Sequence, residues 1–201
     1  YSMDKKYVIF DMDGTLLDSM PFWKNLSVEY LTEHGITEPM EPIIQQVGTM
    51  TLSEASEFFV NRFSLPHTPA QIVELMTQRI RQHYQQDIML KKNVLSYLKE
   101  LKQRGVAMCV ASATAEDLML SALARLEILP YFEFILSCET IKVSKQHPDI
   151  YFMAAQRLGA QPHEIAVFED ARYAVETAKK AGFYVVGVKD EAEAKEWDAI
   201  T

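Results

Sequence analysis

Two aspartates, Asp11 and Asp13, follow directly after the apolar run at residues 8–10. In an extended segment, residues two positions apart point to the same side, so both carboxylates are expected to face one cleft while Met12 turns into the core. Two carboxylates this close repel each other, which raises the pKa of at least one of them unless a cation lies nearby. Folding does not require such a pair, so the spacing indicates a functional site.

Other polar side chains stand where further apolar runs end. They are Ser112 after residues 107–111, Lys145 in the loop after residues 134–136, and Glu169 and Asp170 after residues 165–168. The carboxyl ends of parallel strands lie at one edge of a sheet, which is where ligands bind in open α/β folds. We therefore expect these groups to meet at one edge, with four acids in a small space.

The residue types at this edge favour a metal ion and a phosphate group. Carboxylate oxygens without cysteine or histidine favour Mg²⁺. Lys145 would add a fixed positive charge, and Thr15 and Ser112 would add hydroxyl groups. Gly14 would let the chain turn sharply after the acids. A cation, a lysine, hydroxyls and turn N–H groups together suit a phosphate better than a neutral ligand.

Alternating strands and helices must position these groups. Short apolar runs predict buried parallel strands over residues 8–10, 107–111, 134–136, 165–168 and 184–188. Amphipathic helices are predicted between most of them, over residues 93–103, 116–126, 149–158 and 171–181. The alternation indicates an α/β fold with right-handed crossovers and a doubly wound, Rossmann-like parallel sheet.

The stretch at residues 18–88 interrupts this alternation. It carries helical patterns and several prolines, and it shows no convincing strand. The helical patterns cover residues 22–33, 51–61 and 70–86. We expect an α-helical cap domain at residues 18–88, inserted into a catalytic core of residues 1–17 and 89–201.

The segment DMDGTLLDS at residues 11–19 resembles the DxDGTxxDS signature of the haloacid dehalogenase-like superfamily, in its phosphatase and phosphomutase branch. Three further segments are similar to family motifs in the same order: VASAT at 110–114, SKQHPDIYF at 144–152 and VFEDA at 167–171. The resemblance extends over nearly the whole chain. The helical insertion resembles the cap of the subgroup that includes β-phosphoglucomutase and phosphoglycolate phosphatase.

The resemblance implies chemical roles for the matching residues. It implies that Asp11 is a nucleophile that forms an aspartyl-phosphate, and that Asp13 is the general acid/base that protonates the leaving alcohol and then activates water. It implies that Ser112 and Lys145 hold the transferring phosphoryl group. Thr15 and the backbone N–H of Ala113 are expected to assist them.

The resemblance also implies a metal site and a place for substrate selection. Mg²⁺ is expected to bind Asp11, Asp170 and the backbone carbonyl of Asp13, and Glu169 is expected to support it directly or through water. In this family the cap closes over the core, so the cap should set specificity. The candidate specificity residues are Trp23, Thr49, Met50 and Ser53.

Some positions depart from the family pattern. Relatives usually read GKPxPD where this chain has SKQHPD at residues 144–149, and EDSxxG where it has Ala171 and Ala174. No essential charge is lost, so we expect either lower activity or an adjusted loop. The β-phosphoglucomutases carry a histidine and an arginine where this chain has Trp23 and Thr51, so water is expected to accept the phosphoryl group.

These observations predict an Mg²⁺-dependent phosphatase that hydrolyses a small phosphorylated metabolite, for which a sugar phosphate is the family-level expectation. A sugar phosphomutase is the alternative with the same chemistry. A catalytically silent binding domain is the alternative of a different class, and its only support in the sequence is Ala171 and Ala174.

The overall composition limits the classes of partner. The formal net charge of −8 disfavours nonspecific binding to nucleic acid or anionic membranes. Cys109 and Cys138 lie in unrelated contexts that indicate neither a zinc site nor redox chemistry. No signal peptide or long apolar stretch stands out, so we expect a cytoplasmic protein, and the family default is a monomer.

Overall fold

Five parallel strands form one sheet in the order β3-β2-β1-β4-β5. The strands are β1 (Tyr7–Phe10), β2 (Ala107–Ser112), β3 (Ile135–Ser137), β4 (Ile165–Glu169) and β5 (Tyr184–Gly187). Phe10, the last residue of β1, is paired with Val110 on one side and with Phe168 on the other, so β2 and β4 extend past the end of β1 to Ser112 and Glu169. The computed structural model describes residues 3–189, and it confirms the predicted doubly wound parallel sheet.

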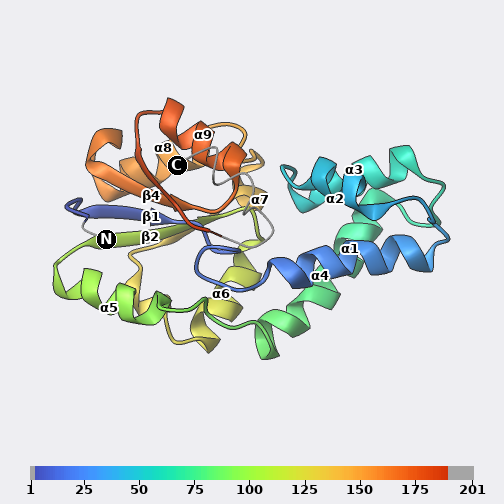
Figure 1. Ribbon diagram of the computed structural model, residues 1–201, viewed down its shortest axis with the longest axis horizontal. Helices are drawn as coiled ribbons and strands as arrows, with labels where there is room; N and C mark the ends of the chain where they lie inside the picture. The colour runs from blue at the N-terminus through green and yellow to red at the C-terminus, as the bar shows by residue number, and fades with distance from the viewer. Residues whose placement is uncertain (1–2, 190–201) are drawn as a thin grey trace.

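Helices cover both faces of the sheet (Figure 1). Helices α5 (Val94–Gln103) and α6 (Glu116–Arg125) lie on one face, and α8 (Asp149–Leu158) and α9 (Arg172–Lys180) lie on the other. Val8 and Phe10 belong to the core on the α5/α6 side, whereas Ile9 belongs to the core on the α8/α9 side. The central strands β1, β2 and β4 are largely buried on both faces, and for this reason their sequences are nearly continuous apolar runs.

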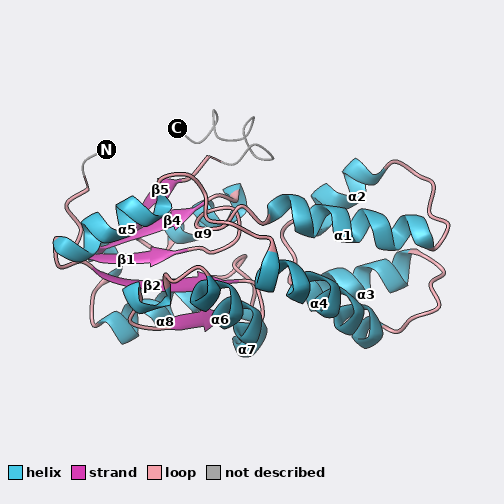
Figure 2. Cartoon of the chain, turned by 90° about the horizontal axis from the view of Figure 1, so that it is seen from below, coloured by secondary structure: helices cyan, strands magenta, loops and turns pink. Residues whose placement is uncertain are grey.

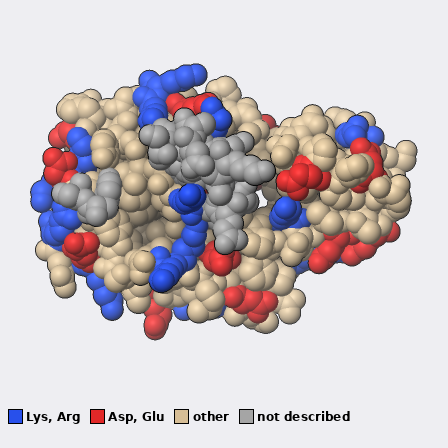
Figure 3. Space-filling view, in the orientation of Figure 1, with Lys and Arg blue, Asp and Glu red and all other residues tan. Residues whose placement is uncertain are grey.

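Four of the other helices that the structure describes form a smaller lobe beyond the carboxyl ends of the strands (Figure 2). They are α1 (Met20–Glu33), α2 (Met40–Val47), α3 (Leu52–Arg62) and α4 (Pro69–Gln86). The space-filling view shows a narrower waist between the two lobes (Figure 3). The helical insertion between β1 and β2 is therefore confirmed, while the domain boundaries at 17/18 and 88/89 stay a prediction.

Helix α2 is absent from the helices that the sequence patterns predict, because the prolines around it resemble breaks. Pro39 is its N-cap and Pro42 lies in its first turn. Proline is tolerated there because the first N–H groups of a helix have no partner within the helix. Short elements complete the described chain: α7 (Cys138–Ile141), η1 (Leu129–Tyr131) and η2 (Pro162–Glu164).

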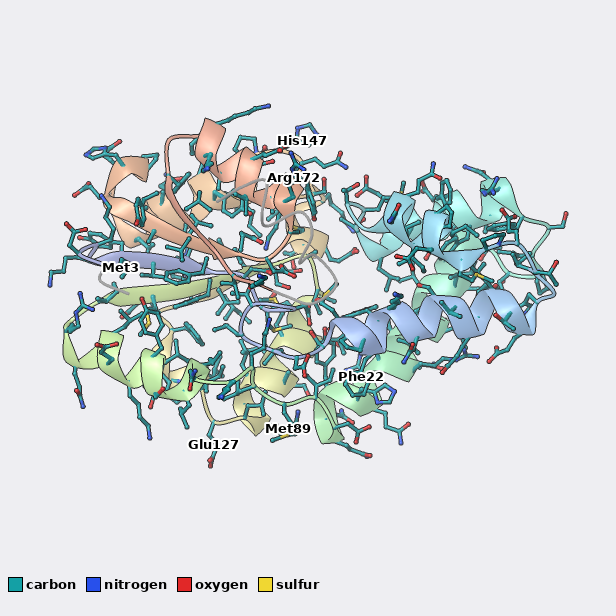
Figure 4. The ribbon with its side chains drawn as sticks, viewed as in Figure 1. Met3, Phe22, Met89, Glu127, His147 and Arg172 are labelled. Carbon is teal, nitrogen blue, oxygen red and sulfur yellow. The ribbon has the colours of Figure 1, made fainter. Side chains whose placement is uncertain are left out.

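The segments that enter and leave the smaller lobe lie side by side. The Asp18 N–H donates to the Met89 carbonyl at 2.9 Å, and the Lys91 N–H donates to the Leu16 carbonyl at 2.9 Å. Leu17 and Leu90 form an isolated antiparallel bridge between these hydrogen bonds. Figure 4 labels Met89 in the returning segment and Phe22 at the start of α1.

Among the described residues, no helix is both long and apolar enough to cross a membrane.

Candidate active site

Asp11 lies immediately beyond β1, at the edge of the sheet that faces the smaller lobe. Its N–H donates to the Phe168 carbonyl at 3.0 Å, which continues the β1–β4 pairing by one residue and brings Asp11 beside Glu169. Met12 is fully buried, as predicted. The strand order reverses between β1 and β4, and such switch points are the usual ligand sites of doubly wound sheets.

Lys145 joins two of the acids. Its ammonium donates to Asp11 Oδ1 at 2.7 Å and to Glu169 Oε1 at 2.6 Å. The Tyr151 hydroxyl also donates to Glu169 Oε1, at 2.7 Å. The Lys145 side chain is 3% exposed. Burial alone would lower the pKa of Lys145, but the charges of Asp11 and Glu169 outweigh it and raise that pKa well above its usual value.

The carboxylates of Asp11, Glu169 and Asp170 each place one oxygen within 4.8 Å of the others. Burial, followed by the charge of Asp11, raises the pKa of Glu169 to about 8 and that of Asp170 well above the ordinary aspartate value. Three acids face one lysine, so the fully ionised group carries a net negative charge that a divalent cation would compensate. The donor set consists of hard oxygens, which suits a cation of that class.

Gly14 allows Asp170 to reach this group. Gly14 has φ +80°, and a Cβ at this position would lie 2.1 Å from Asp170 Oδ2. A side chain here would both strain the backbone and displace the carboxylate. The ammonium of Lys91 donates to the Gly14 carbonyl at 3.1 Å, which helps to hold the turn.

We expect Gly14→Ala to lower metal-dependent activity at least about tenfold, because the new methyl group would displace Asp170 from Asp11. Gly35→Ala is the matched control, since Gly35 has the same φ of +80° but no atom within 4 Å of the point where a Cβ would lie. Both variants incur the backbone strain of about 1–2 kcal/mol for an L-residue in this conformation. Melting temperatures of the two variants measure the backbone strain, and metal titrations measure the displacement of Asp170. Equal metal binding by Gly14→Ala and Gly35→Ala would contradict the prediction.

Thr15 and Ser112 lie at the same edge of the sheet. The Thr15 hydroxyl donates to Asp11 Oδ2 at 3.0 Å. Ser112 is the last residue of β2, and its hydroxyl oxygen accepts from the Thr114 N–H at 3.0 Å. Ala113 lies between Ser112 and Thr114, in the loop that follows β2, and is half-buried. The structure thus places Thr15 on the acidic group, Ser112 at the end of β2, and Ala113 in the loop that follows.

Asp13 has a separate set of partners. Its Oδ1 accepts from the hydroxyls of Ser19 and Tyr84, the latter at 2.5 Å, and its Oδ2 accepts from the Thr114 hydroxyl at 2.5 Å. Burial raises the pKa of Asp13 and outweighs these hydrogen bonds, which act to lower it. The expectation of four acids in one group is corrected, because the carboxylate group within 4.8 Å comprises three residues and Asp13 is held by hydroxyls instead.

Four of these partners were not predicted from the sequence. Ser19, Thr114 and Tyr151 lie inside the family motifs, so proximity to the motif acids was an available signal. Tyr84 offered none, because it continues the buried stripe of α4 formed by Ile72, Met76 and Ile80 at helical spacing. Such a stripe is typical of a helix core face.

The candidate specificity residues lie on the smaller lobe at different distances from the acids. The Trp23 indole N–H donates to the Tyr84 hydroxyl at 2.7 Å. Thr49 Oγ1 accepts from the Gln146 side-chain amide at 2.8 Å, and the Ser53 hydroxyl donates to Glu139 Oε2 at 3.1 Å. The Thr49–Ser53 segment, with half-buried Met50, therefore lies against the core near the Lys145 loop.

The positions that depart from the family motifs lie in the loop that leads into α8 and around the start of α9. Ala171 is the N-cap of α9 and provides no side-chain cap, and Ala174 is fully buried. His147 is exposed, and Arg172 pairs with Glu176 at 3.2 Å. Figure 4 shows His147 and Arg172 on the core lobe, at the end toward the smaller lobe.

Comparison with known proteins identifies the family of this chain. Residues 8–188 match the profile described as haloacid dehalogenase-like hydrolase. The chain is 30% identical to a Thermotoga maritima protein named phosphorylated carbohydrates phosphatase, over 87% of this chain and 81% of that protein. It is 29% identical to fructose-1-phosphate phosphatase YqaB of Escherichia coli, over 90% of this chain and 95% of that protein.

Solved structures share the fold. The structure of CbbY from Rhodobacter sphaeroides in complex with phosphate has a TM-score of 0.82 at 21% identity, covering 93% of this chain and 87% of that one. β-Phosphoglucomutase from Clostridium difficile has a TM-score of 0.78 at 21% identity, covering 96% and 88%. Identities this low show the fold alone. The profile match over residues 8–188 confirms what the four motifs predicted, and the shared fold agrees with it: this chain belongs to the haloacid dehalogenase-like hydrolase family.

Proposed function

We propose that this chain is an Mg²⁺-dependent phosphatase that hydrolyses a small phosphorylated metabolite, in particular a sugar phosphate. The observation that carries the proposal is the buried group of Asp11, Lys145, Glu169 and Asp170 at the edge of the sheet, beside a second, separately held carboxylate on Asp13. The substrate class is supported by the names of two similar proteins, a phosphorylated carbohydrates phosphatase and a fructose-1-phosphate phosphatase.

The reaction has two steps that use the two carboxylates differently. An Asp11 carboxylate oxygen attacks phosphorus, the bond from phosphorus to the alcohol oxygen breaks, and the protonated Asp13 carboxyl gives its proton to that oxygen. Water then attacks the aspartyl-phosphate and gives a proton to Asp13. Inorganic phosphate leaves, and both residues return to their starting states.

Positive charge and hydrogen-bond donors stabilise the phosphoryl group as it transfers. Lys145 is the buried cation beside Asp11, and Thr15 donates to the same carboxylate. In the proposed complex, Lys145, Thr15, Ser112 and the Ala113 N–H hold the phosphoryl oxygens. All four positions lie at the ends of β1 and β2 or in the Lys145 loop.

Asp11, Asp170 and the Asp13 carbonyl are the proposed ligands of Mg²⁺, and Glu169 supports them. Three buried carboxylates within 4.8 Å, two with raised pKa values, fit a hard divalent cation. The bound ion would neutralise negative charge on the phosphoryl group and on the acids around it.

We expect Mg²⁺ to raise the melting temperature more at pH 8 than at pH 6. In the metal-free folded protein the pKa of Glu169 is raised to about 8, whereas its ordinary value is 4.5. Between pH 4.5 and pH 8, the folded state therefore keeps a proton on Glu169 that the unfolded state has already released. This group therefore lowers metal-free stability as the pH rises toward 8. Mg²⁺ must displace that proton, so its binding strengthens over the same range.

Thermal melts at a fixed Mg²⁺ concentration test this pH dependence. Glu169→Gln has no carboxyl proton at this position, so its Mg²⁺-induced shift should vary less between pH 6 and pH 8. An equal or larger shift at pH 6 in the wild type would contradict the prediction.

The test of function is a panel of phosphate monoesters, with and without Mg²⁺, read by release of inorganic phosphate. Release from sugar phosphates supports the proposal. An isomerised phosphosugar without phosphate release would support the mutase alternative, which is not favoured because the two relatives found by sequence, at 29% and 30% identity, are named phosphatases. No turnover on the panel or on an aryl phosphate would support a silent binding domain.

We further propose that the protein acts as a cytoplasmic monomer without nucleic-acid or membrane partners. The net charge of −8 supports the absence of nucleic-acid and anionic-membrane partners.

A further inference from the structure

A chain of hydrogen bonds runs from the smaller lobe to Asp13. The Trp23 indole N–H of α1 donates to the Tyr84 hydroxyl of α4 at 2.7 Å, and that hydroxyl donates to Asp13 Oδ1 at 2.5 Å. The indole N–H can only donate a hydrogen bond, so the Tyr84 oxygen must be the acceptor of the bond from Trp23. The single hydroxyl proton of Tyr84 is consequently available to Asp13, and the direction of the whole chain is fixed.

The other contacts of Asp13 come from different parts of the molecule. Ser19, in the segment leading to α1, donates to Oδ1, and Thr114, in the loop after β2, donates to Oδ2. Tyr84 is fully buried and Thr114 is 7% exposed, so water competes little for these contacts. The carboxylate is thus held on one side by the core and on the other by the insertion.

We propose that Tyr84, oriented by Trp23, is a positioning residue that fixes the Asp13 carboxyl group for proton transfer. The inference rests on the proposed phosphatase function and deepens it, because it assigns a role in that reaction to two residues of the helical insertion. Trp23, a candidate for substrate selection in the sequence analysis, acts here through Tyr84. Neither residue is required to touch the substrate.

Leaving groups distinguish positioning from general structural support. Breaking the bond to an alkyl alcohol needs the proton of Asp13, whereas nitrophenolate leaves without one. Hydrolysis of the aspartyl-phosphate needs Asp13 as a base with either substrate. A misplaced Asp13 therefore slows both steps for an alkyl phosphate but only the second step for p-nitrophenyl phosphate.

The experiment compares Tyr84→Phe with the wild type on p-nitrophenyl phosphate and on the best sugar phosphate of the panel. We expect kcat on the sugar phosphate to fall about 10–100-fold, within the range of general acid–base contributions, with little change in KM. On p-nitrophenyl phosphate we expect a stoichiometric burst of nitrophenolate followed by slow turnover. Trp23→Phe should show the same pattern more weakly, and it carries the test if Tyr84→Phe loses stability.

Tyr97→Phe is the matched control. It removes a hydroxyl from a tyrosine of α5 whose oxygen is buried and has no hydrogen-bond partner among the described residues. Its kinetics should match those of the wild type. Equal losses on both substrates without a burst, or no loss in Tyr84→Phe, would overturn the positioning role alone. A wild type that hydrolyses neither substrate would overturn the proposed function and this inference together.

Discussion

Asp11→Asn should reduce turnover of an aryl phosphate with Mg²⁺ by at least about 10⁴-fold, because loss of a nucleophile removes the covalent route. The asparagine has nearly the same shape, and its amide oxygen retains an acceptor for Lys145, while its NH2 group would donate to the Thr15 hydroxyl oxygen. It also removes the charge that contributes to the raised pKa values of Glu169 and Asp170. The variant should therefore fold as stably as the wild type without metal, which a thermal melt would show.

Rapid acid quenching gives a direct measurement of the covalent step. Wild-type protein mixed with labelled substrate should retain acid-stable phosphate, and Asp11→Asn should retain none. Asp18→Asn is the matched control, because Asp18 belongs to the same motif but is exposed. Equal turnover of Asp11→Asn and the wild type would exclude Asp11 as the nucleophile.

Lys145→Met should abolish activity and destabilise the metal-free protein by about 3–5 kcal/mol. Lys145 is 3% exposed and supplies the positive charge within 2.7 Å of both Asp11 and Glu169. Methionine fills much of the same volume but leaves two carboxylates buried without a cation. Chemical denaturation measures the stability change, and the aryl phosphate assay measures the activity.

A double variant separates the two roles of this lysine. Lys145→Met combined with Glu169→Gln removes one of the two buried acids left without a cation, so it should recover part of the stability without recovering activity. Lys99→Met, at an exposed position of α5, is the control for replacing a lysine by methionine. A Lys145→Met protein as stable as Lys99→Met would show that the buried pair contributes little to folding.

The acidic group could be predicted because strand order and strand ends are encoded locally. Asp11, Glu169 and Asp170 each follow an apolar run, and parallel strands place their carboxyl ends together. Lys145 lies in the loop after residues 134–136, so its place at the edge of the sheet was predicted from that loop, and the family motif supplied its role. Helical patterns without a strand predicted the helical insertion, although the prolines concealed α2.

The surroundings of Asp13 could not be predicted in the same way. The alternation of side chains correctly buried Met12 and indicated that Asp11 and Asp13 share one side. It could not show that Asp13 turns to hydroxyls of Ser19, Tyr84 and Thr114 rather than joining the group of Asp11, Glu169 and Asp170. That choice depends on the packing of α4, and Tyr84 has the spacing of an ordinary core residue in that helix.

The paired segments around Leu17 and Leu90 also bear on how such a protein can change over time. Since the two points where the insertion joins the core are hydrogen-bonded neighbours, its ends already meet at the distance of a hairpin. Closing a loop there costs little extra entropy as its length grows, so helices of another size could replace residues 18–88 without moving the sheet. The insertion, which we propose selects the substrate, could diverge in this way while the sheet and its acidic group stay as they are.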